Sequence, residues 1–199
     1  MLVVGLGNPG KRYAGSPHNV GFRVVDALAE RAGRVSWDAR FDAELVVATL
    51  ATRPVVLLKP MTFMNRSGES VRRAMSFFKI LEESTLVVHD ELDLPRGSVK
   101  LKRGGGEAGH NGLKSVSAEL GSRDYVRLRV GVGRPPLGEA VSDFLLKAPA
   151  EAEAREIEGA LGAASQAVEL VAVHGLARAM NLVNRAAGEP PQAPPSGAN

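Results

Sequence analysis

The chain of 199 residues opens with MLVVGLGNPG (residues 1–10), a short apolar run that is broken by glycines. A run of this kind is typical of a buried β-strand. Apolar residues then recur at helical spacing at Val20, Val24 and Leu28, and Gly33 is a suitable stop for that helix. We therefore expect a buried strand, then a loop rich in glycine and proline, and then a helix at the start of the chain.

Strand and helix patterns continue to alternate along the rest of the chain. Strands are expected at residues 44–49, 54–58, 85–89, 98–103 and 125–132, and helices at 71–78, 113–120 and from 157 onward. Asn65 or Ser67 is expected to cap the helix over 71–78. This alternation predicts an α/β fold with a single domain, a mixed and mostly parallel central sheet, and helices on both faces. The domain is expected to span residues 1–187, and the proline-rich tail 188–199 is expected to be disordered.

The composition is that of an ordinary globular protein, with 44% hydrophobic and 24% charged residues. The chain has no cysteine, which excludes disulfide scaffolds, cysteine-ligated zinc and thiol nucleophiles. Its longest uninterrupted apolar runs have four residues, so we expect neither a transmembrane helix nor a signal peptide. These features predict a cytoplasmic protein.

The formal net charge of +3 hides a strongly basic segment. Residues 96–134 carry nine basic and three acidic side chains, whereas residues 135–199 carry four basic and eight acidic ones. A basic segment can bind a polyanion such as a nucleic acid. Charge alone, however, favours the simpler interpretation, which is a solvated strand face.

Residues 5–10 (GLGNPG) match the Gly-x-Gly-x-x-Gly pattern of dinucleotide-binding folds. In those folds the third glycine opens a helix whose N-terminus holds the pyrophosphate. Here the helical pattern starts only near Asn19, and no acidic residue follows at the end of a second strand. We therefore expect the glycines to turn the backbone and present Asn8, without binding a dinucleotide.

A histidine and an acidic cluster lie next to two of the expected strands. His18 precedes the first helix, where an imidazole can act as a general base because its pKa lies near working pH. Asp90 follows the strand over 85–89, and a carboxylate there can orient a histidine as in a hydrolytic triad. The alternatives are a purely structural histidine, or a divalent metal on Asp90, Glu91 and Asp93. We expect no metal, because no second acidic cluster or histidine pair has ligand spacing.

Three asparagines, Asn8, Asn65 and Asn111, each lie at an expected strand-to-helix junction. Carboxamides gathered around an imidazole can bind ester and amide carbonyls, and we expect Asn65 and Asn111 to stabilise an oxyanion. The chain has no Gly-x-Ser-x-Gly elbow and no His-Glu-x-x-His motif. A hydrolase built from these residues would therefore use water that is activated by His18.

The glycine-rich loop at residues 104–112 leads into an expected helix and can present backbone N–H groups to an anion. Lys102, Arg103 and Lys114 flank this loop and favour phosphate contact, and Arg129 on the neighbouring strand is a fourth candidate. A merely flexible loop is the alternative.

Five motifs, in order, resemble those of the bacterial peptidyl-tRNA hydrolase family. They are GLGNPG (5–10), Tyr13 with HNVGF (18–22), KPMTFMN (59–65), DELD (90–93) and GHNGL (109–113). The resemblance runs from Met1 to about Arg185. It implies hydrolysis of the ester between a peptide and the 3′-terminal adenosine of tRNA, which recycles tRNA from aborted translation.

The resemblance also implies roles for single residues. His18 matches the family's proton acceptor, and Asp90 matches the carboxylate that holds it in its basic form. Asn8 matches the residue that separates blocked from free aminoacyl-tRNA. Five further positions match tRNA or substrate binding, with the role of His110 the least defined among them: Tyr13, Phe63, Asn65, His110 and Asn111.

The family further implies a monomer whose partner is the acceptor end of peptidyl-tRNA, with no cofactor, membrane or protein partner. Residues 138–148 resemble the family's lid, although the lid region is short of lysines. Two other departures are Ser16-Pro17, where the family usually has Thr-Arg, and Ala108, where glycine is common.

The residues alone leave two other function classes open. One is a non-catalytic RNA-binding module that uses the basic strands. The other is a dinucleotide-dependent oxidoreductase, against which the missing helix start and acidic partner argue.

Overall fold

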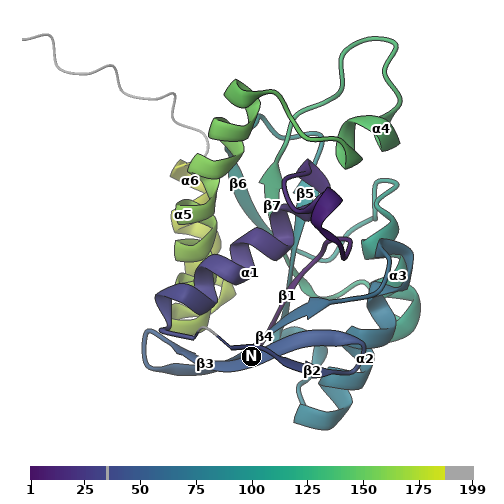
Figure 1. Cartoon of the computed structure of the whole chain (residues 1–199). Coiled ribbons are helices and arrows are strands. Elements are labelled where there is room, and N and C mark those ends of the chain that lie inside the picture. The colour runs from purple at the N-terminus through teal and green to yellow at the C-terminus, as the bar shows by residue number, and fades with distance from the viewer. Residues whose placement is uncertain (35, 187–199) are drawn as a thin grey trace, which may run out of the picture.

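The computed structural model describes residues 1–34 and 36–186, and its strands form one seven-stranded sheet (Figure 1). The strands are β1 (Leu2–Gly5), β2 (Asp38–Arg40), β3 (Ala43–Leu50), β4 (Arg53–Pro60), β5 (Thr85–Glu91), β6 (Val99–Arg103) and β7 (Val126–Gly131). Their order across the sheet is β2-β3-β4-β1-β5-β7-β6. The inner strands β4, β1, β5 and β7 are paired in parallel, while β2, β3 and β6 add antiparallel edges. The expected mixed sheet is therefore confirmed, with its parallel pairs at the centre.

Helices cover both faces of the sheet. They are α1 (Val20–Arg31), α2 (Ser67–Phe78), α3 (Asn111–Leu120), α4 (Val141–Leu146), α5 (Glu151–His174) and α6 (Leu176–Ala186). α1, α5 and α6 pack on one face and α2 and α3 on the other (Figure 1), so the expected α/β fold is confirmed. The tail 188–199, for which the sequence predicts disorder, lies outside the described residues. None of the helices in the described part of the chain is long and apolar enough to cross a membrane.

The first strand lies at the centre of the molecule and is buried on both of its faces, as is typical of a central parallel strand. Val3 packs into the core beneath α1 and α5, whereas Leu2 and Val4 pack into the core beneath α2 and α3. Because β1, β4, β5 and β7 are parallel, their carboxyl ends meet at one edge of the sheet. Ligand sites in open α/β sheets form at this edge.

The glycine motif after β1 does not open a helix. Two short 3-10 turns follow instead, η1 (Lys11–Tyr13) and η2 (Pro17–Asn19), and α1 begins only at Val20. His18 lies in η2, just before α1. The arrangement thus lacks the strand–turn–helix geometry that holds a pyrophosphate.

The N-cap expected for the second helix is wrong. The N-cap position of α2 is Arg66, and no side chain caps it. Asn65 lies in the turn η3 (Met64–Arg66), and the Ser67 hydroxyl donates a hydrogen bond to the Met64 carbonyl at 2.9 Å. Because η3 runs directly into α2, the preceding turn takes the place of a side-chain cap.

α1 approaches the sheet closely at Gly21. A Cβ atom at this position would lie 2.5 Å from the backbone N and O of Leu6 and 2.5 Å from the carbonyl oxygen of Val88. These are backbone atoms of the central sheet, so they cannot move aside cheaply. Gly21 therefore sets the distance between α1 and strands β1 and β5.

We expect Gly21→Ala to lower the free energy of unfolding by about 1–3 kcal/mol, the usual cost of overpacking a core. Gly159→Ala in α5 is the matched control, because its Cβ would meet no atom within 4 Å. That substitution should raise the free energy of unfolding by about 0.5–1 kcal/mol, since alanine restricts the unfolded chain. Urea denaturation followed by circular dichroism measures both, and equal stability of the two variants would contradict the close approach.

Candidate active site

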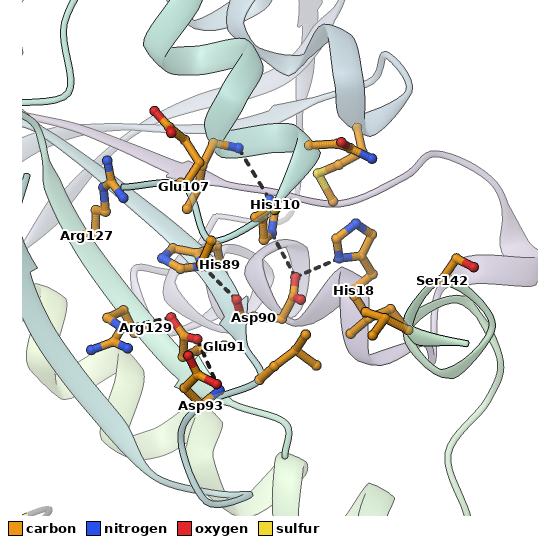
Figure 2. Close-up of a pocket in the computed structure, with 18 of the residues that line it drawn as sticks. His18, His89, Asp90, Glu91, Asp93, Glu107, His110, Arg127, Arg129 and Ser142 are labelled. Atoms are coloured by element: carbon orange, nitrogen blue, oxygen red, sulfur yellow. Dashed lines mark hydrogen bonds and ion pairs between the residues drawn. The ribbon is translucent and has the colours of Figure 1, made fainter. Parts of the chain in front are cut away.

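A cavity of about 920 Å³ lies at the carboxyl edge of the sheet, between the sheet and α4 (Figure 2). Its lining comes from the loop after β1, the turns η2 and η3, the strands β5, β6 and β7, and the loop that leads into α3. α4 closes one side, where Val141, Ser142, Leu145 and Leu146 line the cavity. The lid segment 138–148 thus contains the helix that borders the pocket.

His18 and Asp90 meet in this cavity, as Figure 2 shows. The ring Nδ1 of His18 lies 2.7 Å from Oδ1 of Asp90, and both side chains are buried. An ionised carboxylate can only accept hydrogen bonds, so Nδ1 of His18 carries the proton. The other ring nitrogen, Nε2, is then free to take up a proton from another molecule.

The two groups set each other's protonation. Burial by itself lowers the pKa of His18, but the charge of Asp90 and the hydrogen bond to it outweigh burial and raise this pKa above 6.5. Burial alone would raise the pKa of Asp90, but His18 and His110, through their charge when protonated and through their hydrogen bonds, hold it well below 3.8. Asp90 is therefore a carboxylate at neutral pH, and His18 is a stronger base than a free imidazole.

A second histidine contacts the same carboxylate. Nε2 of His110 lies 3.0 Å from Oδ1 of Asp90, and the rings of His110 and His18 are 4.9 Å apart between centroids. On its other side, Nδ1 of His110 accepts hydrogen bonds from the backbone N–H groups of Gly112 and Leu113. His110 is thus the N-cap of α3 as well as a neighbour of Asp90.

Asn8 is held in one orientation. Its Oδ1 accepts a hydrogen bond from the Met64 N–H at 2.9 Å. This contact fixes which side-chain atom is the oxygen and leaves Nδ2 as the polar atom without this partner. Its backbone is held by Asn19, whose Oδ1 accepts from the Asn8 N–H at 2.8 Å and whose Nδ2 donates to the Asn8 carbonyl at 2.9 Å. Asn8 therefore offers the cavity a hydrogen-bond donor. In the sequence, only the position of Asn19 beside His18 points to this role.

The face of β7 that carries Arg127 is not solvated, so for this residue the simpler interpretation of the basic segment is wrong. Arg127 is 2% exposed, and its guanidinium donates to the carbonyls of Gly105 and Gly106 at 2.7 and 2.6 Å. It thereby anchors the glycine-rich loop from beneath. The alternating pattern of β7 could not show this, because it does not reveal that the loop before α3 folds over Arg127.

His89, next to Asp90 on β5, is buried and stays neutral. Burial lowers its pKa to about 3, and the neighbouring His110 and Arg127 act in the same direction. Its Nδ1 lies 2.7 Å from the carbonyl oxygen of Asp90, which can only accept, so Nδ1 is the donor. His89 therefore adds no charge to the site at neutral pH.

The structure brings seven of the predicted site residues to the cavity: Asn8, His18, Asp90, His110, Asn111, Lys102 and Arg129. Five others do not line it: Tyr13, Phe63, Asn65, Arg103 and Lys114. Phe63 is 61% exposed, and Arg103 forms a two-pronged ion pair with Asp124. Of the three asparagines, two line the cavity with His18, while Asn65 lies exposed on η3.

Two members of the acidic cluster at the end of β5 are paired with arginines. Glu91 accepts from Nε of Arg129 at 2.9 Å, and Asp93 pairs with Arg134. Among the described residues, the groups with potential ligand atoms close enough to share a metal are instead His18, Asp90 and His110, within 4.8 Å of one another. The carboxylates of Glu91 and Asp93 are thus directed at guanidinium groups.

The two sequence departures have structural counterparts. Pro17 is the first residue of η2 and is buried, so its fixed φ suits the start of the turn that carries His18. Ala108 adopts a φ of 47°, in the left-handed region that favours glycine. The glycine-rich loop therefore keeps this backbone conformation without a glycine at that position.

Comparisons with known proteins agree on one family. The family model for Peptidyl-tRNA hydrolase matches residues 2–191. The peptidyl-tRNA hydrolase of Frankia alni is 50% identical over 180 residues, which cover 90% of this chain and 91% of that protein. That of Nocardia farcinica is 50% identical over 184 residues, covering 92% and 95%. A crystal structure of peptidyl-tRNA hydrolase from Acinetobacter baumannii matches with a TM-score of 0.86 and 40% identity, over 92% of this chain and 93% of that one.

We expect Asp90→Asn to lower the pKa of His18, because burial remains while the attraction of the carboxylate is lost. An NMR titration of the His18 ring protons measures this shift directly. Asp93→Asn is the control: Asp93 pairs with Arg134 at the surface, so its loss should leave the titration of His18 close to that of the unmodified protein. An unchanged or raised His18 pKa in the Asp90 variant would contradict the assigned pairing.

Proposed function

The chain belongs to the peptidyl-tRNA hydrolase family, and we propose that His18 is the general base of its reaction and Asp90 the group that orients this base. The protein hydrolyses the ester bond between the peptide and the 3′-terminal adenosine of peptidyl-tRNA. The observation that carries the proposal is the buried 2.7 Å contact between His18 and Asp90 inside the cavity at the carboxyl edge of the sheet.

In the proposed mechanism, Nε2 of His18 takes a proton from a water molecule as that water attacks the ester carbonyl. The carboxylate of Asp90 stabilises the resulting imidazolium through the Nδ1 hydrogen bond. When the tetrahedral intermediate collapses, the C–O bond to the ribose breaks and the imidazolium returns its proton to the departing oxygen. Since only the neutral imidazole accepts a proton, the rate falls as pH drops through the raised pKa of His18.

We further propose that Nδ2 of Asn8 reads the substrate's first amide. Because the oxygen of Asn8 is occupied by the Met64 N–H, the atom left for the substrate is a donor. A donor recognises a carbonyl oxygen, and the acyl carbonyl on the first amino group is present in peptidyl-tRNA and absent from free aminoacyl-tRNA. Asn111, at the start of α3, has a different proposed role: its carboxamide stabilises the oxyanion.

The acceptor end of the tRNA is proposed to enter the cavity past Lys102 and Arg129, which line it and carry positive charge. Arg103, Lys114, Tyr13 and Phe63 lie outside the cavity, where they can contact other parts of the tRNA. The proposed form is a cytoplasmic monomer without a protein partner or a cofactor.

His18→Ala is expected to lose about 10²–10⁴-fold in rate, the usual contribution of a general base, while tRNA affinity changes little. Release of labelled peptide from an N-blocked aminoacyl-tRNA measures the rate, and filter binding measures affinity. His174→Ala, at an exposed histidine on α5, is the control and should behave like the unmodified protein. Near-normal turnover by the His18 variant would overturn the assignment.

Asn8→Asp keeps the acceptor toward Met64 and replaces the Nδ2 donor by a second acceptor. The rate on N-acetyl-aminoacyl-tRNA, measured above the titration of His18, should fall by about 10²-fold, the cost of one lost donor in a reaction site. The preference for N-acetylated over free aminoacyl-tRNA should fall with it. Asn181→Asp, on the exposed side of α6, makes the same charge change away from the cavity and should alter neither value. A variant of Asn8 with full preference would show that another residue reads the amide.

A further inference from the structure

We infer that His110 is a positioning residue: the first turn of α3 fixes its single proton on Nε2, and through that proton it holds Asp90 in place for His18. This inference rests on the proposed roles of His18 and Asp90. It differs from the role implied by the family resemblance, in which His110 belongs to the residues that bind the substrate.

The placement of the His110 proton follows from the backbone. Nδ1 of His110 lies 3.1 Å from the backbone nitrogen of Gly112 and 3.3 Å from that of Leu113. Backbone N–H groups only donate hydrogen bonds, so Nδ1 must offer its lone pair to both. A ring whose Nδ1 bears no proton is neutral and carries its proton on Nε2.

That proton points at Asp90. Nε2 of His110 lies 3.0 Å from Oδ1 of Asp90, the same oxygen that accepts from Nδ1 of His18 at 2.7 Å (Figure 2). One carboxylate oxygen thus lies between two donors that come from different elements, η2 and the loop before α3. His18 and His110 therefore carry their protons on opposite ring nitrogens.

The hydrogen bonds that link α3, His110, Asp90 and His18 can have only one arrangement of donors and acceptors. The N–H groups of α3 donate to His110, His110 donates to Asp90, and His18 donates to Asp90 from its other side. Because backbone N–H groups cannot become acceptors, His110 cannot reverse its two bonds. Nε2 of His18 is then the one ring nitrogen among these two histidines that is left to accept a proton from water.

A neutral donor suits this position better than a cation. A positive His110 would place an N–H group against the two N–H groups of α3, at the positive end of the helix dipole. Its positive charge would also offset the negative charge of Asp90, which raises the pKa of His18. A neutral ring holds the carboxylate by a hydrogen bond and leaves its charge to act on His18.

The other ionisable groups around Asp90 do not compete for this oxygen. His89, whose ring is 5.2 Å from that of His110, donates its Nδ1 proton to the backbone carbonyl of Asp90. Arg127 donates to the carbonyls of Gly105 and Gly106. A metal ion bound by His18, Asp90 and His110 would conflict with this tautomer. To bind Nε2 of His110, the ion would displace the proton to Nδ1, and Nδ1 could then no longer accept hydrogen bonds from α3.

The proton positions are tested first, by long-range ¹H–¹⁵N NMR of the histidine rings at a pH above the titration of His18. The expected result is a proton on Nε2 of His110 and on Nδ1 of both His18 and His89, with exposed His174 as the reference for an unconstrained ring. The signal that disappears in His110→Asn identifies His110. A proton on Nδ1 of His110, alone or together with Nε2, would overturn the inference, whatever the enzymatic activity.

Two substitutions then separate the contacts of His110. In His110→Asn the side-chain oxygen takes the place of Nδ1, so α3 keeps its cap while Asp90 loses a donor. In His110→Gln the side-chain nitrogen reaches toward the place of Nε2, so Asp90 regains a donor while the cap is lost. Each of the two variants thus keeps one contact of His110 and loses the other.

We expect His110→Asn to keep its free energy of unfolding and its KM, and to lose about 10–100-fold in kcat, the range known for residues that orient the ligands of a metal by a hydrogen bond. His110→Gln should recover part of that loss. A rise in KM at unchanged kcat would assign His110 to substrate binding and overturn the inference, as would a glutamine variant no more active than the asparagine one. If His18→Ala stays active while the tautomers are as expected, the proposed base is wrong and the position of the His110 proton still stands.

Discussion

The close contact of α1 with the central sheet at Gly21 is the constraint on which the site depends. Gly21 lies three residues after His18, and the sheet atoms it approaches include the carbonyl oxygen of Val88, two residues before Asp90. The helix that directly follows His18 and the strand that carries Asp90 are therefore held in backbone contact. A hydrogen bond of 2.7 Å between buried side chains requires supports that cannot slide, and this contact supplies them.

Electrostatics imposes the second constraint, because a carboxylate buried this deeply must be surrounded by donors. Asp90 meets that need with the rings of two histidines, while His89 holds its backbone carbonyl. The nearby carboxylates of Glu91 and Asp93 are paired with arginines and do not add negative charge beside it. The site thus concentrates one negative charge where it strengthens one base.

The α/β architecture could be anticipated from the sequence because periodicity reports burial, and the His18–Asp90 pairing could be anticipated because their motifs resemble those of the family. Contacts between separate segments of the chain could not be anticipated in this way. Arg127 reads as a solvated residue until the glycine-rich loop covers it, and Asn65 looks equivalent to Asn8 until η3 turns it outward. The cap of α2 was missed for a related reason, since a 3-10 turn leaves little trace in the apolar pattern. The family resemblance places His110 among the substrate-binding residues, and its contacts with Asp90 and with the first turn of α3 are visible only in the structure.

Arg127 has a consequence for how this protein can change over evolutionary time. The shape of the glycine-rich loop is held from beneath by a guanidinium on β7, which grips two consecutive carbonyl groups rather than side chains. Side chains on the outer surface of the loop can therefore be exchanged without moving His110 and Asn111 behind them. The outer surface of this loop can thus change in charge and size from one lineage to the next, while His110 and Asn111 keep their places.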